Sequence, residues 1–68
     1  MALAPHQERV VAEKRDLDEK IEKLNAFVTS AAITQVSLAE ARRLRDQLAY
    51  MRSYSAVLQE RINAFEAG

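Results

Sequence analysis

The stretch ARRLRDQLAYMRSYSAVLQERINAF, residues 41–65, decides the fold. Its apolar residues, together with one serine, recur at alternating spacings of three and four. This is the heptad pattern of a helix that packs one face on another helix. The pattern consists of Ala41, Leu44, Leu48, Met51, Ser55, Leu58, Ile62 and Phe65. Ser55 is its polar member, and we expect a close helix approach or a local hydrogen bond there. Together with the capping-box sequence Ser37-Leu38-Ala39-Glu40, the pattern predicts a helix over about 37–67.

A first helix is predicted upstream, over about 5–28. Pro5 suits the first helical turn, where its missing N–H costs nothing. A single apolar stripe follows, and Lys14 takes an intervening heptad position, where a polar residue weakens packing but can fix register. The stripe consists of Val10, Leu17, Ile21, Leu24 and Val28. The charged positions offer ion pairs in the favourable i,i+4 order. These are Asp16–Lys20 and Glu19–Lys23.

The segment 29–36 joins the two predicted helices. It lacks charge and gathers Thr, Ser and β-branched residues, which lower helix propensity. A joint this short folds the two helices back on each other as an antiparallel hairpin. We therefore expect an all-α fold and a single helical domain over 1–68.

Composition excludes several classes of function. Ten basic residues balance ten acidic ones, so no net charge draws the chain to long nucleic acid or to a membrane surface. Without cysteine and with one histidine, a metal or other cofactor is not expected. No Ser-His-Asp set or glycine-rich phosphate loop occurs, so we do not expect an enzyme. No apolar run approaches the ~20 residues of a membrane span, and the N-terminal residues do not form a signal peptide, which predicts a cytoplasmic location.

The chain is expected to self-associate. Two helices bury one face each, and so small a core rarely offsets the entropy of ordering 68 residues. A second, partly apolar strip of Tyr50, Tyr54 and Val57 flanks the heptad face, and two stripes on one helix indicate two neighbours. We expect a homo-oligomer, most simply a dimer that forms a four-helix bundle, or an assembly of such dimers.

The basic residues of the second helix are all arginine, and two tyrosines are interleaved with them. Arginine binds phosphate through paired hydrogen bonds, and a tyrosine ring can stack on a base. With a net charge of zero, this composition favours small anionic ligands over duplex DNA. The alternative is that the arginines are ordinary solvated side chains and the tyrosines pack in an interface. His6, beside Pro5, is either a plain exposed side chain or a ring that stacks on a base or donates to a phosphate.

Motifs along nearly the whole chain resemble a family of very small phage-encoded helical proteins. In the first helix the likeness rests on Arg9-Val10-Val11, Glu13-Lys14, Leu17-Asp18-Glu19-Lys20-Ile21-Glu22-Lys23-Leu24 and Phe27-Val28. In the second helix it rests on Gln47, Leu48, Met51, Tyr54, Leu58, Arg61 and Ile62. The family includes the anti-CBASS sponge, which binds cyclic oligonucleotide second messengers and keeps them from activating host effectors.

The resemblance implies a homo-oligomer in the host cytoplasm, a hexamer, whose inter-subunit pockets hold cyclic dinucleotides and, in some members, cyclic trinucleotides. It implies that Lys20 contacts the ligand across the subunit boundary and that Arg61 holds phosphates in a separate trinucleotide pocket. The sponge has an aromatic residue near the start of its first helix, where this chain has Pro5 and His6, so stacking falls to His6 or is lost. On this hypothesis the ligand-binding residues are Lys20, Arg61, His6 and Arg9.

Other functions stay open at the level of sequence. A small phage accessory protein could act as a protein-interaction module, docking the heptad face of its second helix on a host helix without any nucleotide ligand. A nucleic-acid-binding hairpin would retain duplex in a strongly salt-dependent way. An enzyme would need catalytic residues that the chain does not offer.

Overall fold

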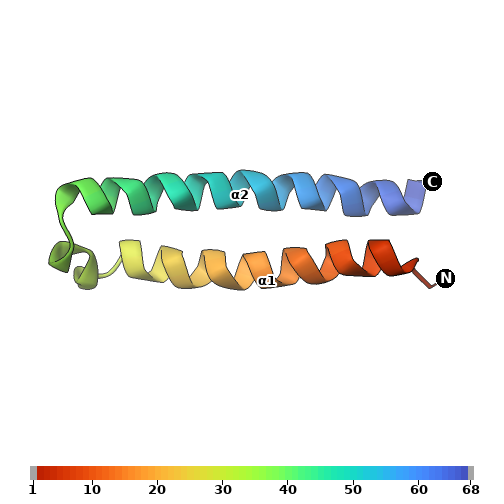
Figure 1. The fold of residues 1–68 in the computed structure, drawn as a ribbon, viewed down its shortest axis with the longest axis horizontal. Coiled ribbons are helices and arrows are strands. Elements are labelled where there is room, and N and C mark those ends of the chain that lie inside the picture. The colour runs from red at the N-terminus through yellow and green to blue at the C-terminus, as the bar shows by residue number, and fades with distance from the viewer. Residues whose placement is uncertain (1, 68) are drawn as a thin grey trace.

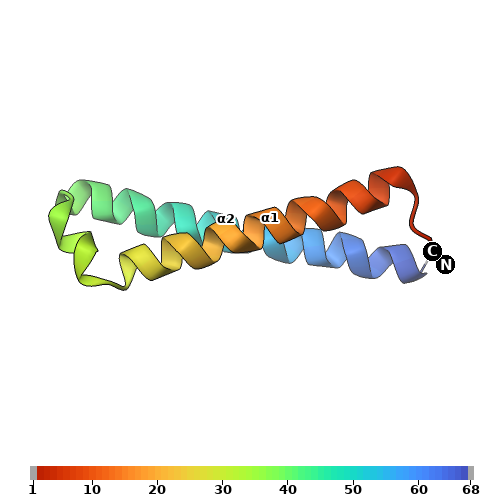
Figure 2. The same ribbon diagram turned by 90° about the horizontal axis from the view of Figure 1, so that it is seen from below.

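The computed structural model describes residues 2–67, with side chains to Phe65, and consists of two long helices joined by a short turn. Helix α1 covers Pro5–Val28, the 3₁₀ helix η1 covers Ala31–Gln35, and α2 covers Leu38–Ala67. The long helices run antiparallel and side by side (Figure 1). They cross at a shallow angle, and both chain ends lie at the same end of the hairpin (Figure 2). The predicted all-α fold with two long helices is confirmed.

The hairpin is elongated. It measures 48 × 15 × 14 Å, and its radius of gyration is 15.4 Å, against about 11 Å for a compact domain of this length. Its surface is therefore large for the number of residues, and little of the chain lies far from solvent.

Side chains close the first turn of each long helix. The Gln7 side-chain oxygen accepts a hydrogen bond from the backbone N–H of Ala4 at 2.9 Å. The Ser37 hydroxyl accepts from the N–H of Glu40 at 3.0 Å, which is one half of the predicted capping box. The Glu40 carboxylate does not complete the box, because it accepts a hydrogen bond from Arg43 Nε at 2.9 Å.

Hydroxyl groups end α1 and begin η1. Thr29 Oγ1 donates to the carbonyl of Asn25 at 2.7 Å, and Ser30 Oγ donates to the carbonyl of Phe27 at 2.9 Å. Ser30 Oγ also accepts from the N–H of Ala32 at 3.2 Å. Hydroxyls compete in this way with the backbone hydrogen bonds of a helix. The joint that the sequence predicts as irregular is therefore built around a turn of 3₁₀ helix.

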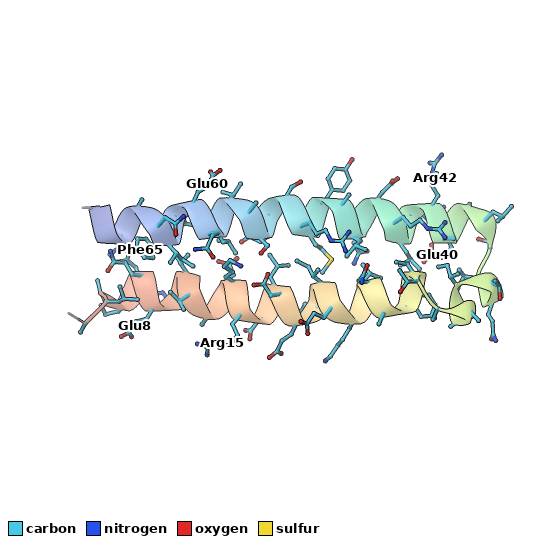
Figure 3. All side chains as sticks on the ribbon, turned by 180° about the vertical axis from the view of Figure 1, so that it is seen from behind. Glu8, Arg15, Glu40, Arg42, Glu60 and Phe65 are labelled. Carbon is cyan, nitrogen blue, oxygen red and sulfur yellow. The ribbon has the colours of Figure 1, made fainter. Side chains whose placement is uncertain are left out.

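The core is a single row of residues between α1 and α2. The buried apolar side chains are Val10, Val28, Ala41, Leu48 and Leu58. Leu58 has no exposed surface. Side-chain directions agree with this arrangement, because Phe65 lies between the helices while Glu8, Arg15 and Glu60 point away from the partner helix (Figure 3). The heptad face of α2 is thus occupied by α1 of the same chain.

A polar cluster interrupts this apolar row at its midpoint. Lys14 Nζ donates to Asp18 Oδ2 at 2.7 Å and to Ser55 Oγ at 3.2 Å. Ser55, which is buried, donates to Asp18 Oδ1 at 2.5 Å. The two polar heptad positions of the sequence, Lys14 and Ser55, therefore meet across the hairpin. The hydrogen bond expected at Ser55 is present, and Asp18 completes the cluster.

Truncating the Leu58 side chain tests how much of the hairpin's stability comes from this row of buried side chains. Leu58→Ala leaves a cavity at the most buried position, so the free energy of unfolding should fall by about 2–5 kcal/mol. Leu38→Ala is the matched control, because Leu38 is 91% exposed, and its effect should stay within about 0.5 kcal/mol. Urea denaturation followed by circular dichroism measures both. Equal effects of the two substitutions on the free energy of unfolding would contradict the assignment of Leu58 to the core.

The polar cluster makes stability depend on pH. Hydrogen bonds from Lys14 and from Ser55 lower the pKa of the Asp18 carboxyl. A carboxyl whose pKa is lower in the folded state stabilises the fold at neutral pH, and that contribution is lost as the pH falls through the folded pKa. Asp18→Asn should therefore be less stable than the parent near pH 7 and should lose less stability on going to pH about 2. Thermal unfolding at both pH values tests this, with Asp46→Asn, an exposed position, as the control. An unchanged pH dependence in Asp18→Asn would refute the assignment.

Candidate functional site

A shallow hollow of about 480 Å³ lies between the first half of α1 and the middle of α2. We call it the Arg9–Lys20 hollow. It is lined by Arg9, Ala12, Glu13, Asp16, Leu17, Lys20 and Tyr54. Its volume falls within the range of small-molecule sites, although it is open to solvent on one side.

Four charged side chains of the hollow come from one face of α1. Arg9, Glu13, Asp16 and Lys20 are spaced by four, three and four residues, which places them above one another along the helix. The cations stand at the two ends and the carboxylates between them. Within residues 2–67, the side chains of Arg9, Asp16 and Lys20 make no hydrogen bond or ion pair. These groups are therefore available to a ligand.

The ion pairs predicted from i,i+4 spacing are not the ones that form. Neither Asp16–Lys20 nor Glu19–Lys23 is paired among the described residues, whereas Lys14–Asp18 and Arg43–Glu40 are. Exposed pairs gain little over solvation, so spacing alone does not select them. Lys14 differs because Ser55, on the opposite helix, adds a second partner for its ammonium group.

Tyr54 is the side chain that α2 contributes to the hollow. Its hydroxyl donates a hydrogen bond to Glu13 Oε2 on α1. Tyr54 is 44% exposed, so part of the residue remains open to contact. A partly exposed aromatic ring beside unpaired cations can bind a flat, anionic molecule through stacking and charge together.

A family profile described as Sequestin matches residues 4–64 of this chain. The chain belongs to the Sequestin family. The match confirms the family resemblance of the sequence, and the family name suggests sequestration. No significant match is found among the curated proteins or among the solved structures.

The predicted ligand residues of this Sequestin chain divide into two groups. Arg9 and Lys20 line the same hollow. His6 lies in the first turn of α1 and Arg61 near the end of α2; both are exposed, and neither lines the hollow. Arg61 follows Tyr54 by seven residues and therefore shares its face of α2. One chain thus brings together two of the four residues and leaves the other two further along the hairpin.

An apolar surface continues from the hollow onto α2. Tyr50 and Val57, one turn to either side of Tyr54, are 75% and 49% exposed. We call Tyr50, Tyr54 and Val57 the α2 apolar strip. Tyr54 also lines a neighbouring hollow of about 500 Å³ formed by α2 alone, together with Arg43, Asp46, Gln47, Tyr50 and Met51. Because Tyr54 lines both hollows, the Arg9–Lys20 hollow and the α2 apolar strip form one continuous face of the Sequestin hairpin.

Sequence reasoning missed Glu13 and Asp16 as members of the site. It considered Asp16 only as an ion-pair partner of Lys20, and it considered Tyr54 as part of the apolar strip and as a ring among the arginines of α2. The signal that would have found them is the pair of polar heptad positions, because setting Lys14 opposite Ser55 brings Tyr54 beside Glu13. Within the described part of the chain, no three or more His, Cys, Asp or Glu side chains gather in a way that could hold a metal ion. No helix in that range is long and apolar enough to cross a membrane.

Proposed function

We propose that this Sequestin-family chain is a sponge that holds intact cyclic di- or trinucleotide second messengers and so blocks host CBASS-type immune signalling. The observation that carries the proposal is the Arg9–Lys20 hollow, in which two unpaired cations flank a tyrosine ring. The family name supports sequestration as the mode of action.

The chemistry of the hollow suits such a ligand. A cyclic oligonucleotide carries phosphates, which Arg9 and Lys20 can bind, and flat bases, which the ring of Tyr54 can stack on. Sequestration withdraws messenger from solution in proportion to the number of binding sites, so it needs abundant protein and tight binding but no catalytic group. The lack of a Ser-His-Asp set and of a glycine-rich phosphate loop in the sequence is compatible with this mode of action.

A second copy of the chain would complete the site. One hairpin supplies only an open hollow, and the adjacent α2 apolar strip is exposed to an extent that favours burial against another subunit. In the proposed homo-oligomer, a hexamer by resemblance, Lys20 reaches ligand across a subunit boundary. His6 and Arg61 then belong to the trinucleotide pocket or to the rim of the dinucleotide pocket.

Removing one cation of the hollow tests the ligand site. Lys20→Ala should weaken binding of cyclic dinucleotides by about tenfold or more, because a charge-assisted contact to phosphate is lost. Lys23→Ala removes an exposed lysine of the same helix that lies outside the hollow and should bind as the parent does. Equilibrium dialysis against a panel of cyclic di- and trinucleotides measures both variants. Equal affinities of Lys20→Ala and the parent would count against the proposal.

Charging the α2 apolar strip tests the assembly. Val57→Asp places a carboxylate in the surface proposed to pack between subunits, so it should reduce the oligomer to smaller species. Ala49→Asp adds the same charge at an exposed position outside the strip and should leave the assembly intact. Light scattering coupled to size-exclusion chromatography gives the mass of each. A parent chain that elutes as a monomer, or a Val57→Asp variant with unchanged mass, would exclude this interface.

A protein-interaction module without a nucleotide ligand is the second candidate function, and the exposed α2 apolar strip favours it. The heptad face cannot serve as its docking surface, since Leu48 and Leu58 are buried against α1 of the same chain. The expectation that this face docks on a host helix is therefore wrong, and a partner helix would have to use the strip. Under this alternative Tyr50→Asp abolishes function in phage infection assays while Lys20→Ala is silent.

A further inference from the structure

The polar cluster of Lys14, Asp18 and Ser55 lies where an apolar row would otherwise continue. Ser55 is buried and the Lys14 side chain is only 19% exposed, so both polar groups lose hydration. Within the described part of the chain, no buried side-chain nitrogen or oxygen lacks a hydrogen-bond partner. Replacement of such a cluster by apolar side chains of similar volume is often neutral or stabilising. Stability alone therefore does not account for the polar cluster.

The apolar row permits a second alignment of the two helices. The heptad face of α2 continues beyond Ser55 to Ile62 and Phe65. If α2 slides by seven residues, Ile62 takes the place of Ser55 opposite Lys14, and the heptad positions of α1 still face heptad positions of α2. The segment 29–37 does not prevent this shift, because it reaches about 30 Å when extended and the shift displaces the helix ends by about 10 Å. Apolar spacing and joint length therefore leave both alignments open.

The polar heptad positions distinguish the two alignments. In the observed one, Lys14 Nζ donates to Ser55 Oγ and Ser55 Oγ donates to Asp18 Oδ1. In the shifted one, Lys14 faces Ile62 and Ser55 faces Ile21. The Ser55 hydroxyl then has no polar partner on α1, and burying it there costs the free energy of its desolvation. The two alignments thus differ chiefly in the hydrogen bonds of the polar cluster.

We propose that the polar cluster is a conformational device that selects one of two helix alignments that apolar packing leaves open. The alignment decides which side chains meet across the hairpin. It brings the Tyr54 hydroxyl to Glu13, and a shift by seven residues would put Arg61 in the place of Tyr54. The inference concerns the chain itself and does not depend on any ligand.

Moving the serine by one heptad tests the proposal. The exchange Ser55→Ile/Ile62→Ser keeps the composition of the chain, and it should slide α2 by seven residues because Lys14 then finds a hydroxyl at position 62. The matched control is Leu58→Ile/Ile62→Leu, which exchanges two apolar residues of the same face and should keep the alignment. Circular dichroism verifies the helical content of each variant.

Spin labels report the alignment. Arg15→Cys and Arg42→Cys provide attachment points in a chain without cysteine, at exposed positions that point away from the opposite helix (Figure 3). Arg42 lies about 18 Å along the hairpin axis from the residue opposite Arg15, and the exchange should increase this offset to about 28 Å. Double electron–electron resonance measures the label separation, with labelled chains diluted in unlabelled ones so that pairs within one chain dominate.

The parent and the control should give the same label separation, and the serine exchange should lengthen it, by at most about 10 Å. A serine exchange that keeps the parent separation would overturn the proposal, because apolar packing or the joint would then set the alignment. Loss of helical content in the serine exchange would overturn it too, because the shifted alignment would not be a stable alternative. A control that lengthens the separation as much as the exchange would show that the serine has no special role.

Discussion

Two helices packed side by side share a single interface, and in this chain that interface buries only a narrow row of side chains. Among the described residues, five apolar side chains and Ser55 are buried. The rest of an elongated hairpin faces solvent, including the α2 apolar strip and the Arg9–Lys20 hollow beside it. Because the core is this small, the proposed self-association and ligand binding would both use the surface that the hairpin leaves exposed.

The polar cluster at the midpoint of the interface determines how the two helices align. Lys14 and Asp18 on α1 meet Ser55 on α2. A shift of α2 by one heptad would set Leu48 or Ile62 opposite Lys14 and leave its ammonium group against an apolar side chain, whereas the observed register gives it two oxygen partners. The same register brings Tyr54 to Glu13. Helix alignment and the geometry of the hollow therefore depend on the same few polar contacts.

The sequence alone was sufficient to predict the two helices but not to predict the candidate site, and the reason is physical. Heptad spacing and the Ser37 cap are local signals, so they predicted the two long helices, and the short joint over 29–36 predicted their antiparallel pairing. The hollow is not local: it combines α1 residues near position 13 with Tyr54, and the apolar periodicity of one helix does not specify its alignment with the other. The information on alignment lies in the two polar heptad positions, Lys14 and Ser55, which the structure brings into contact. The unformed Asp16–Lys20 pair and the half-formed capping box share another cause, since exposed polar groups choose among several partners and water at nearly equal free energy.

The central claim is that this Sequestin chain binds an intact cyclic oligonucleotide as an oligomer, and native mass spectrometry with a panel of cyclic di- and trinucleotides tests it most directly. With at least one member of the panel, we predict a species whose mass equals several chains plus a fixed number of ligands, and the unmodified ligand should be recovered after denaturation. Under the same conditions, an oligomer or monomer that carries no ligand mass with any cyclic di- or trinucleotide would contradict the claim. Recovery of a linear, hydrolysed product would contradict it as well.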